Sequence, residues 1–386
     1  MFLIMVQESD RQSRTLHTIL DYQCVLKYSC SAFLKSITAS FWILDDILPL
    51  RQLTAGLANS PAYLFQPATT YRVRRSTYTD TPLPPDEPAG QNPPDGAIVD
   101  YYLAQPASGA ATLEILDSQD KVVRRYSSTD KPQVTEAELK KQLIPLYWIR
   151  MPRVLSASAG AHRWVWDLHY TTPMATHYSY PISAVPHDTP RVPLGPRALP
   201  GQYTVRLTVN GKSYSAPLTV KMDPRVKTPP AGLEQQFQME VQLASMMTQV
   251  AEGVLQARSA GDQLHKLAAQ ASGPVKDAVT AFENKLAGVA GKPSGSLAPP
   301  SAQVTLTRVN GEVTTLYGDV DRADAAPNAA QVNAMAETEH NFAALMQRWN
   351  ALKNTDLPAL NRQLQGAGLP EVQLRADPAN DAGEEE

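Results

Sequence analysis

Paired carboxylates are the first feature of this sequence that could carry chemistry. Hydrolysis of a glycosidic bond uses two carboxylates that face each other about 5 to 9.5 Å apart. The apolar stretch FWILDDILPLRQL contains the adjacent pair Asp45 and Asp46. If this stretch is a strand, the two side chains point to opposite faces and cannot act on one substrate. We therefore expect the pair to form a strand end or a turn rather than a catalytic site.

Acidic residues at two further places in the sequence could take part in catalysis. Asp167 follows a predicted strand, and an aspartate in that place commonly accepts hydrogen bonds from the loop backbone. Asp86 and Glu87 lie in the proline-rich run PLPPDEPAGQNPPDG, which would hold their side chains poorly. The sequence therefore predicts no catalytic residue.

Four histidines fall within one loop-rich stretch and could bind a metal: His162, His169, His177 and His187. Their spacing matches no zinc signature, and no cysteine lies near them. His162 could instead lie on the polar face of a strand or at the rim of a sheet. We predict no metal site and no cofactor from these residues.

Aromatic side chains could form a platform that stacks on a sugar. The candidates are Tyr101, Tyr102, Trp164, Trp166, Tyr178 and Tyr180. Trp164 and Trp166 share one face of a predicted strand, which favours a place in the core. Tyr178 and Tyr180 lie in the long proline-rich loop 170–200, and they are the better candidates for contact with a ligand.

The remaining short motifs do not indicate a catalytic or ligand-binding site. The sequence contains neither a G-x-S-x-G nucleophile elbow nor a glycine-rich phosphate-binding loop. Arg72, Arg74 and Arg75 form a small basic cluster that we expect to be a solvated part of a linker. Three methionines are expected in a helix core rather than in a binding groove: Met239, Met246 and Met247.

Composition limits the class of protein. The chain has 386 residues, 43% of them hydrophobic and 19% charged, with a net charge of -3. This apolar content is too high for general disorder, and the length suggests two to three domains. The acidic balance argues against a nucleic-acid partner, because phosphate contacts need concentrated Lys and Arg. No apolar run is long enough to span a membrane. The two cysteines, Cys24 and Cys30, both lie near the N-terminus, so no disulfide is expected in the rest of the chain. The apolar start is interrupted by Glu8 and Asp10, so we expect no signal peptide.

The distribution of proline divides the chain. Of the 32 prolines, 23 lie between Pro61 and Pro230, and residues 231–273 contain none. Strands and loops are therefore expected first and helices afterwards. We predict an α+β multidomain chain with an atypical N-terminal segment (1–40), a short strand segment (41–60), a proline-rich linker (61–96), an antiparallel Ig-like β-sandwich (97–224), an antiparallel helical bundle or coiled coil (231–367) and a disordered acidic tail (368–386).

Alternating hydrophobicity supports the sandwich. The stretch ATLEIL alternates apolar and polar residues, and GQYTVRLTV does the same before Asn210-Gly211, the strongest hairpin signal in the chain. The helical part shows stripes at steps of four and three, as in Val275, Val279, Phe282 and Leu286. Residues 303–320 fit either a hairpin around Asn310-Gly311 or a helix, and we favour the helix because it would complete a bundle.

Several stretches carry a family resemblance. These are FWILDDILPLRQL with PPDEPAGQNPPDGAIVDYYL, TLEILDSQDKVVRRYSS, SAGAHRWVWDLHY, LPGQYTVRLTVNGKSYSAPLTVKMDPRVKTP and LYGDVDRADAAPNAAQ. They resemble the C-terminal portion of large exported bacterial proteins with a β-propeller of sortilin-type or BNR repeats, often labelled glycosyl hydrolase. The middle segment also resembles the Ig-like domain of flagellar hook-capping proteins, which is an interaction module.

The resemblance covers roughly residues 41–370 and implies a function. FWILDD would be the last strand of the propeller, and residues 1–40 do not look like propeller sequence, so we expect a C-terminal fragment with an unrelated or frame-shifted start. Any site on the propeller would then be absent. Because no set of reactive side chains converges in the sequence, we expect a non-catalytic accessory or interaction region, and the resemblance implies that the parent protein is exported. The expected partners are its own propeller, another protein or a second copy bound through the helices. A glycoside hydrolase and a carbohydrate-binding module remain the alternatives.

Overall fold

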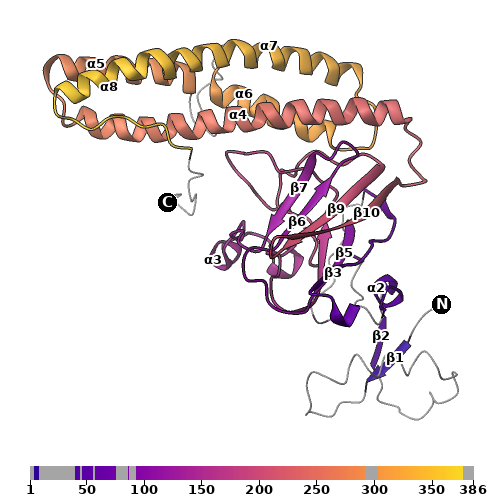
Figure 1. Cartoon of the computed structure of the whole chain (residues 1–386). Helices are drawn as coiled ribbons and strands as arrows, with labels where there is room; N and C mark the ends of the chain where they lie inside the picture. Colours follow the sequence, from indigo (N-terminus) through magenta and orange to yellow (C-terminus); the bar gives the residue numbers. More distant parts are fainter. Residues whose placement is uncertain are drawn as a thin grey trace, which may run out of the picture. The chain divides into compact units, whose positions relative to one another are not determined.

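The structure is a computed structural model that describes residues 4–7, 40–43, 46–54, 57–74, 86, 93–291 and 303–376. The chain divides into a small unit, Met1–Leu53, and a large unit, Thr54–Glu386. It is an α+β protein, in which the strands of the large unit are followed along the chain by long helices (Figure 1).

The described residues of the small unit form one two-stranded sheet and one short helix. Its elements are β1 (Ile4–Gln7), β2 (Ser40–Ile43), which pairs antiparallel with β1, and α2 (Leu48–Arg51). The Leu48 N–H donates to Asp46 Oδ1 over 2.9 Å at the start of α2. Asp46 therefore forms the turn that the sequence predicts, whereas Asp45 lies outside the described residues.

The large unit begins with two sheets. A five-stranded sheet has the order β4-β10-β9-β6-β7, and a three-stranded sheet has the order β3-β5-β8. Neighbouring strands pair antiparallel except β4, which is parallel to β10. The strands are β3 (Ala62–Leu64), β4 (Thr70–Arg72), β5 (Ala97–Leu103), β6 (Thr112–Leu116), β7 (Val122–Ser127), β8 (Gly160–Trp166), β9 (Gly201–Val209) and β10 (Lys212–Met222).

The two sheets share one hydrophobic core. Burial alternates strictly along β5, and every second residue of β9 from Tyr203 onward is buried, as the period of two predicts. Trp166 is fully buried and Trp164 is 8% exposed, so both are core residues as expected. Asn210 and Gly211 have φ of 50° and 76°, and they close the predicted hairpin between β9 and β10.

The predicted linker 61–96 is partly wrong. β3 pairs with β5, and β4 pairs with β10, so both belong to the sheets. Each of these strands has only three residues, which is too short to show a period of two between flanking prolines. Residues 75–85 and 87–92 of the predicted linker lie outside the described part of the chain.

Short helices and long loops complete this part of the large unit. They include η1 (Leu57–Asn59), α3 (Glu136–Leu139) and η2 (Leu146–Trp148). A small second core forms beneath the loops from Val134, Leu139, Ile144 and Ile149. The Thr189 N–H donates to the Trp148 carbonyl over 2.9 Å, which ties the loop 170–200 to this core.

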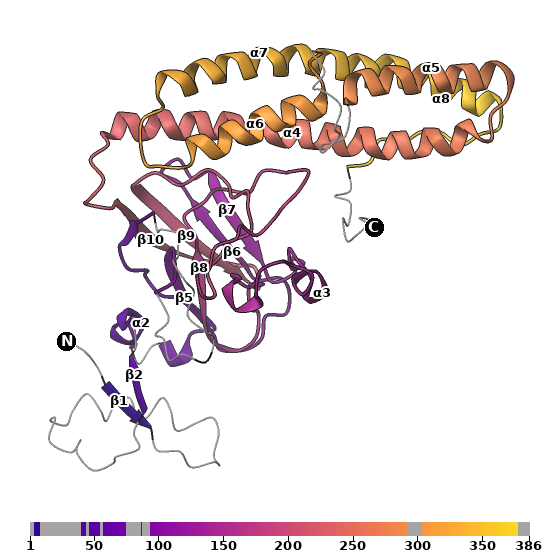
Figure 2. The same ribbon diagram turned by 180° about the vertical axis from the view of Figure 1, so that it is seen from behind.

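Long helices form the rest of the large unit. They are α4 (Pro230–Ala268), α5 (Gly273–Ala290), α6 (Leu306–Val320), α7 (Ala329–Ala351), the π-helical turn η3 (Leu352–Asp356) and α8 (Leu357–Gly366). α4 packs against both α5 and α6, while α7 packs on α6 and α8 on α5. Figures 1 and 2 both show α5 and α6 following one another along the length of α4.

The ambiguous segment 303–320 is a helix, as favoured from the sequence. The apolar stripe of α6 is buried at all five positions, Leu306, Val309, Val313, Leu316 and Val320. The Thr305 side chain caps the helix by accepting the Arg308 N–H. Asn310-Gly311 therefore lies inside a helix, because burial of the stripe outweighs a local turn preference.

The predicted disordered tail 368–386 is wrong over its first part. Val372 is 2% exposed, and its N–H donates to Asn361 Oδ1 over 3.0 Å. Gln263 of α4 exchanges two side-chain hydrogen bonds with the Gln373 backbone. Backbone pairing with side chains fixes this segment, which composition does not reveal, and residues 377–386 lie outside the described residues. In the part of the chain that the structure describes, no helix is long and apolar enough to cross a membrane.

Candidate functional site

Six ionisable residues converge where the sheets meet the helices, and we call them the junction cluster. They come from β4 and the residues after it, from the loop before β9, from α4 and from the turn after α6. The members are Arg72, Arg74, Arg197, Glu240, Asp321 and Asp324.

Arg72 and Asp324 form the central ion pair of the junction cluster. Arg72 Nη2 lies 2.7 Å from Asp324 Oδ1, and the two side chains are 2% and 4% exposed. Arg72 Nη1 also donates to the Ala198 carbonyl over 2.9 Å. Burial would raise the pKa of Asp324, but Arg72 and Arg74 lower it below its usual value. The pair therefore ties β4 to the turn after α6.

Arg74 adds a second cation at the edge of the junction cluster. Its Nη2 lies 3.1 Å from Asp321 Oδ1 and 3.3 Å from Asp324 Oδ1. Its side chain is 27% exposed. The sequence predicts a solvated linker at Arg72 and Arg74, and this prediction is wrong for Arg72, which is buried in the sheet. Arg75 lies outside the described residues.

Arg197 is a buried cation that forms no ion pair among the described residues. It is 4% exposed, and Nη2 donates to the Val73 carbonyl over 2.7 Å. Burial lowers its pKa, and repulsion from Arg74 acts in the same direction. The loop that carries Arg197 packs closely on the backbone of Tyr170, because a Cβ at Gly195 would collide with the Tyr170 carbonyl.

Glu240 is the buried acid that faces this loop. It lies in α4 and is 1% exposed. Oε2 accepts the Arg197 N–H over 3.3 Å, whereas Oε1 has no hydrogen-bond partner among the described residues. Burial raises the pKa of Glu240 to about 7, and the nearby Asp321 adds to this rise.

Neutral side chains reinforce the same contact. Tyr317 donates to the Leu194 carbonyl over 2.9 Å, and Thr228 donates to the Asp324 carbonyl over 2.6 Å. Gln236, which is 1% exposed, donates to the carbonyls of Val320 and Ala323. These bonds link backbone that is far apart in sequence, so the arrangement joins structural elements rather than opening a cleft to a substrate.

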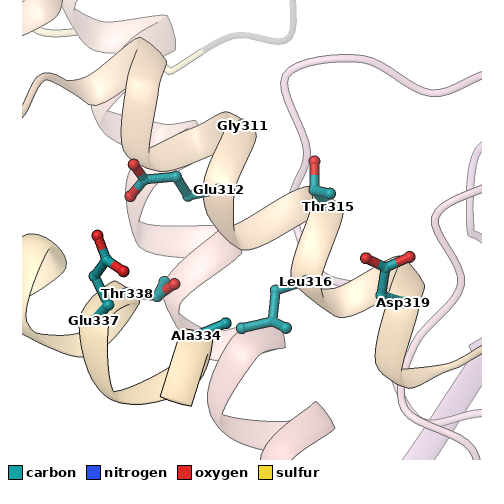
Figure 3. A pocket seen from close by; sticks show the side chains of 8 residues that line it. All are labelled: Gly311, Glu312, Thr315, Leu316, Asp319, Ala334, Glu337 and Thr338. Atoms are coloured by element: carbon teal, nitrogen blue, oxygen red, sulfur yellow. The ribbon is translucent and has the colours of Figure 1, made fainter. Parts of the chain in front are cut away.

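A shallow hollow between α6 and α7 is a second candidate, and we call it the α6–α7 groove (Figure 3). Its volume is about 410 Å³, and it is lined by Gly311, Glu312, Thr315, Leu316, Asp319, Ala334, Glu337 and Thr338. Figure 3 shows Glu312 and Glu337 towards one end of the groove and Asp319 towards the other. The lining residues of α6 follow steps of three and four, which place them on one face of the helix.

Two of the three groove carboxylates already have a cation beside them. Arg308 Nε lies 2.8 Å from Glu312 Oε1, and Arg322 Nε lies 3.4 Å from Asp319 Oδ1. Glu337 forms no ion pair among the described residues. The groove is thus an acidic surface whose charge is partly neutralised.

A third hollow, of about 520 Å³, lies between the loop after β8 and α4. Its lining is mostly apolar and includes Val122, Tyr170, Pro196 and Val241. No charged side chain lines it, so it offers no obvious chemistry.

The two tyrosines that we predicted as ligand contacts are engaged within their loop. The Arg191 guanidinium lies 4.3 Å from the centre of the Tyr178 ring. The Tyr178 hydroxyl donates to the Pro173 carbonyl over 2.8 Å. Tyr180 is half-buried and packs against the small second core. Neither ring stands free on the surface as a stacking platform would.

The remaining candidates are dispersed. The Asp167 side chain accepts the His169 N–H over 3.2 Å, which confirms the loop role predicted for this aspartate. His169 is buried, whereas His177 and His187 are exposed. Among the described residues, no group of three His, Cys, Asp or Glu side chains is placed to hold a metal ion. Met246 and Met247 are buried in the helix core, as expected.

Sequence reasoning missed four members of the junction cluster, namely Arg197, Glu240, Asp321 and Asp324. One signal was present. Gln236 and Glu240 lie four residues apart on the same face of α4 as the buried Leu233, so two polar residues interrupt an apolar stripe. A comparison with known proteins found no matching family model and no matching curated protein.

Proposed function

We propose that this chain is a non-catalytic interaction region, similar to the part that follows the β-propeller in exported bacterial proteins with sortilin-type or BNR repeats. In this proposal the two sheets form an Ig-like β-sandwich, and the helices form an antiparallel helical bundle. The sequence stretches that resemble this family lie mainly in the strands and in the end of α6. The resemblance also implies a place outside the cytoplasm.

The junction cluster is the observation that carries the proposal. Enzymes shift the pKa of groups that a substrate can reach. Here the strongly shifted carboxyl, Glu240, is 1% exposed and contacts the backbone of a neighbouring loop. The ionisable groups that converge therefore join the sheets to the helices, which suits a support that presents surfaces to a partner.

The α6–α7 groove is the surface that we propose for the partner. It is open to solvent, and its lining includes the small residues Ala334 and Gly311 together with Glu337, which forms no ion pair among the described residues. A partner could place a basic side chain against Glu337, which is exposed. The proposed partner is the propeller of the same family.

A binding measurement tests this proposal. The whole chain would be immobilised, and a propeller of a sortilin-type protein of this family would be passed over it. We expect Glu337→Lys to weaken binding at least about tenfold, since it inverts the charge in the groove. Glu339→Lys is the matched control, because Glu339 lies exposed on the same helix but does not line the groove.

Equal effects of the two variants, or an absence of binding by the wild-type chain, would contradict the groove as the contact surface. Sedimentation of the chain over a range of concentrations tests self-association separately. A dimer that Glu337→Lys dissociates would replace the propeller by a second copy as the partner.

The two alternatives have distinct signatures. A glycoside hydrolase would release the chromophore from a panel of aryl glycosides, and Glu240→Gln or Asp321→Asn would abolish that release. A carbohydrate-binding module would retain glycans on an array and lose them on Tyr178→Ala or Tyr180→Ala. Either result would overturn the proposed function.

A further inference from the structure

Glu240 is held in an environment that suits its neutral form. The carboxyl is buried and forms no ion pair among the described residues, although three arginines belong to the same cluster. One oxygen accepts a single backbone N–H, and the other has no partner among the described residues. An ionised carboxylate in this place would lack the hydrogen bonds and the cation that a buried charge needs.

Charged or titratable residues from four segments of the chain lie around Glu240. Arg72 and Arg74 come from β4 and the residues after it, and Arg197 comes from the loop before β9. Tyr317 comes from the end of α6. Asp321 and Asp324 come from the turn after α6 and engage Arg72 and Arg74.

These contacts leave the ionised form of the Glu240 carboxyl without a cation of its own. The two aspartates already use the guanidinium groups of Arg72 and Arg74 at 2.7 to 3.3 Å. Arg197 directs Nη2 to a backbone carbonyl and offers Glu240 only its main-chain N–H. Burial and repulsion from Asp321 raise the pKa of Glu240, and together they outweigh the Arg197 N–H and the attraction of Arg72 and Arg74, which lower it.

We propose that the contact between α4 and the loop 194–198 is a pH-sensitive latch, closed while Glu240 is protonated and loosened when Glu240 ionises. The moving parts are the Glu240 carboxyl and the backbone N–H of Arg197. The Arg72–Asp324 pair stays formed over the same range and keeps the sheets tied to the helices.

The direction of the effect follows from the shift. The folded protein holds the pKa of Glu240 at about 7, above the ordinary value of 4.5. The contribution of Glu240 to stability is therefore fully present below about pH 4.5 and is lost as the pH rises through about 7. The latch closes in mildly acidic medium and loosens in mildly alkaline medium.

Hydrogen exchange of the whole chain tests the latch. Peptides that contain Arg197 would be followed at about pH 5.5 and about pH 8.5, with exchange in the β9–β10 hairpin correcting for the intrinsic effect of pH. We expect protection around Arg197 to fall at least about tenfold at the higher pH in the wild type. Glu240→Gln keeps the hydrogen-bond acceptor without the charge, so its protection should change less than about twofold.

Glu234→Gln is the matched control, because Glu234 is exposed on the same helix and should leave the wild-type response intact. An unchanged wild-type protection, or a Glu240→Gln protein that still responds to pH, would overturn the latch. If that variant fails to fold, carboxyl NMR of the wild type decides. A titration midpoint for Glu240 below about 5 would also overturn the proposal.

Discussion

Two aspartates near the end of α6, Asp319 and Asp324, lie in opposite environments, one solvated and one buried. Asp319 lies in the α6–α7 groove and is 47% exposed beside Arg322, which is 81% exposed. Asp324, five residues later, is 4% exposed beside Arg72, which is 2% exposed. The first pair is solvated on both sides, whereas the second has lost its water and depends on its partner. Burial, rather than the presence of an ion pair, decides what each pair contributes.

The strongest test of this contrast removes one charge from the buried pair. Asp324→Asn should lower the free energy of unfolding by about 3 to 5 kcal/mol, because it leaves Arg72 buried without a compensating charge. Urea denaturation monitored by circular dichroism would measure the loss. A loss no larger than that of the equivalent change at Asp319 would break the distinction between the two environments.

A second test moves the loop that carries Arg197. Gly195→Ala would bring a Cβ against the carbonyl oxygens of Tyr170 and Thr171, so the backbone must shift. We expect a loss of about 1 to 3 kcal/mol in urea denaturation, as for other overpacked sites. Wild-type stability in this variant would show that the loop is free to adjust and that the junction is not tightly packed.

The corresponding change in the groove should have the opposite sign. Gly311 lies inside α6, and a Cβ there would meet no heavy atom within 4 Å. Gly311→Ala should therefore raise the free energy of unfolding by about 0.5 to 1 kcal/mol, because alanine loses less backbone entropy in a helix. Thermal and urea unfolding would both report the gain, and a destabilised variant would show that the groove is less open than described.

The smallest effect is expected at the solvated pair. Asp319→Asn removes the charge facing Arg322, and the midpoint of urea unfolding should stay within experimental error because water replaces the contact. Raising the salt concentration in the wild type provides the control, since screening should remove the same contribution. A clear shift in the midpoint would mean that this surface pair belongs to a larger network.

Much of the fold was predictable because it depends on local pattern. The alternation in β5 and β9, the turn at Asn210-Gly211 and the stripe of α6 each occur within one segment, so their signals survive in the sequence alone. The strands β3 and β4 were missed because three residues cannot show a period, and their pairing partners lie far along the chain.

The candidate site was harder to predict because its members are distant in sequence. Arg72 and Asp324 are separated by 252 positions, and Arg197 and Glu240 by 43. An arginine between prolines resembles a solvated linker residue unless its partner is known. Only the interrupted stripe of α4, with Gln236 and Glu240 among buried apolar residues, pointed to a buried polar contact.

The sequence by itself determined that strands precede helices, where the boundary between them lies and that Trp164 and Trp166 are buried, since these features follow from periodicity and from the distribution of proline. Tertiary structure alone decided which charges lose their water. Whether an arginine or a glutamate is solvated or buried depends on the surface that packs over it, and that surface comes from segments that no local pattern connects.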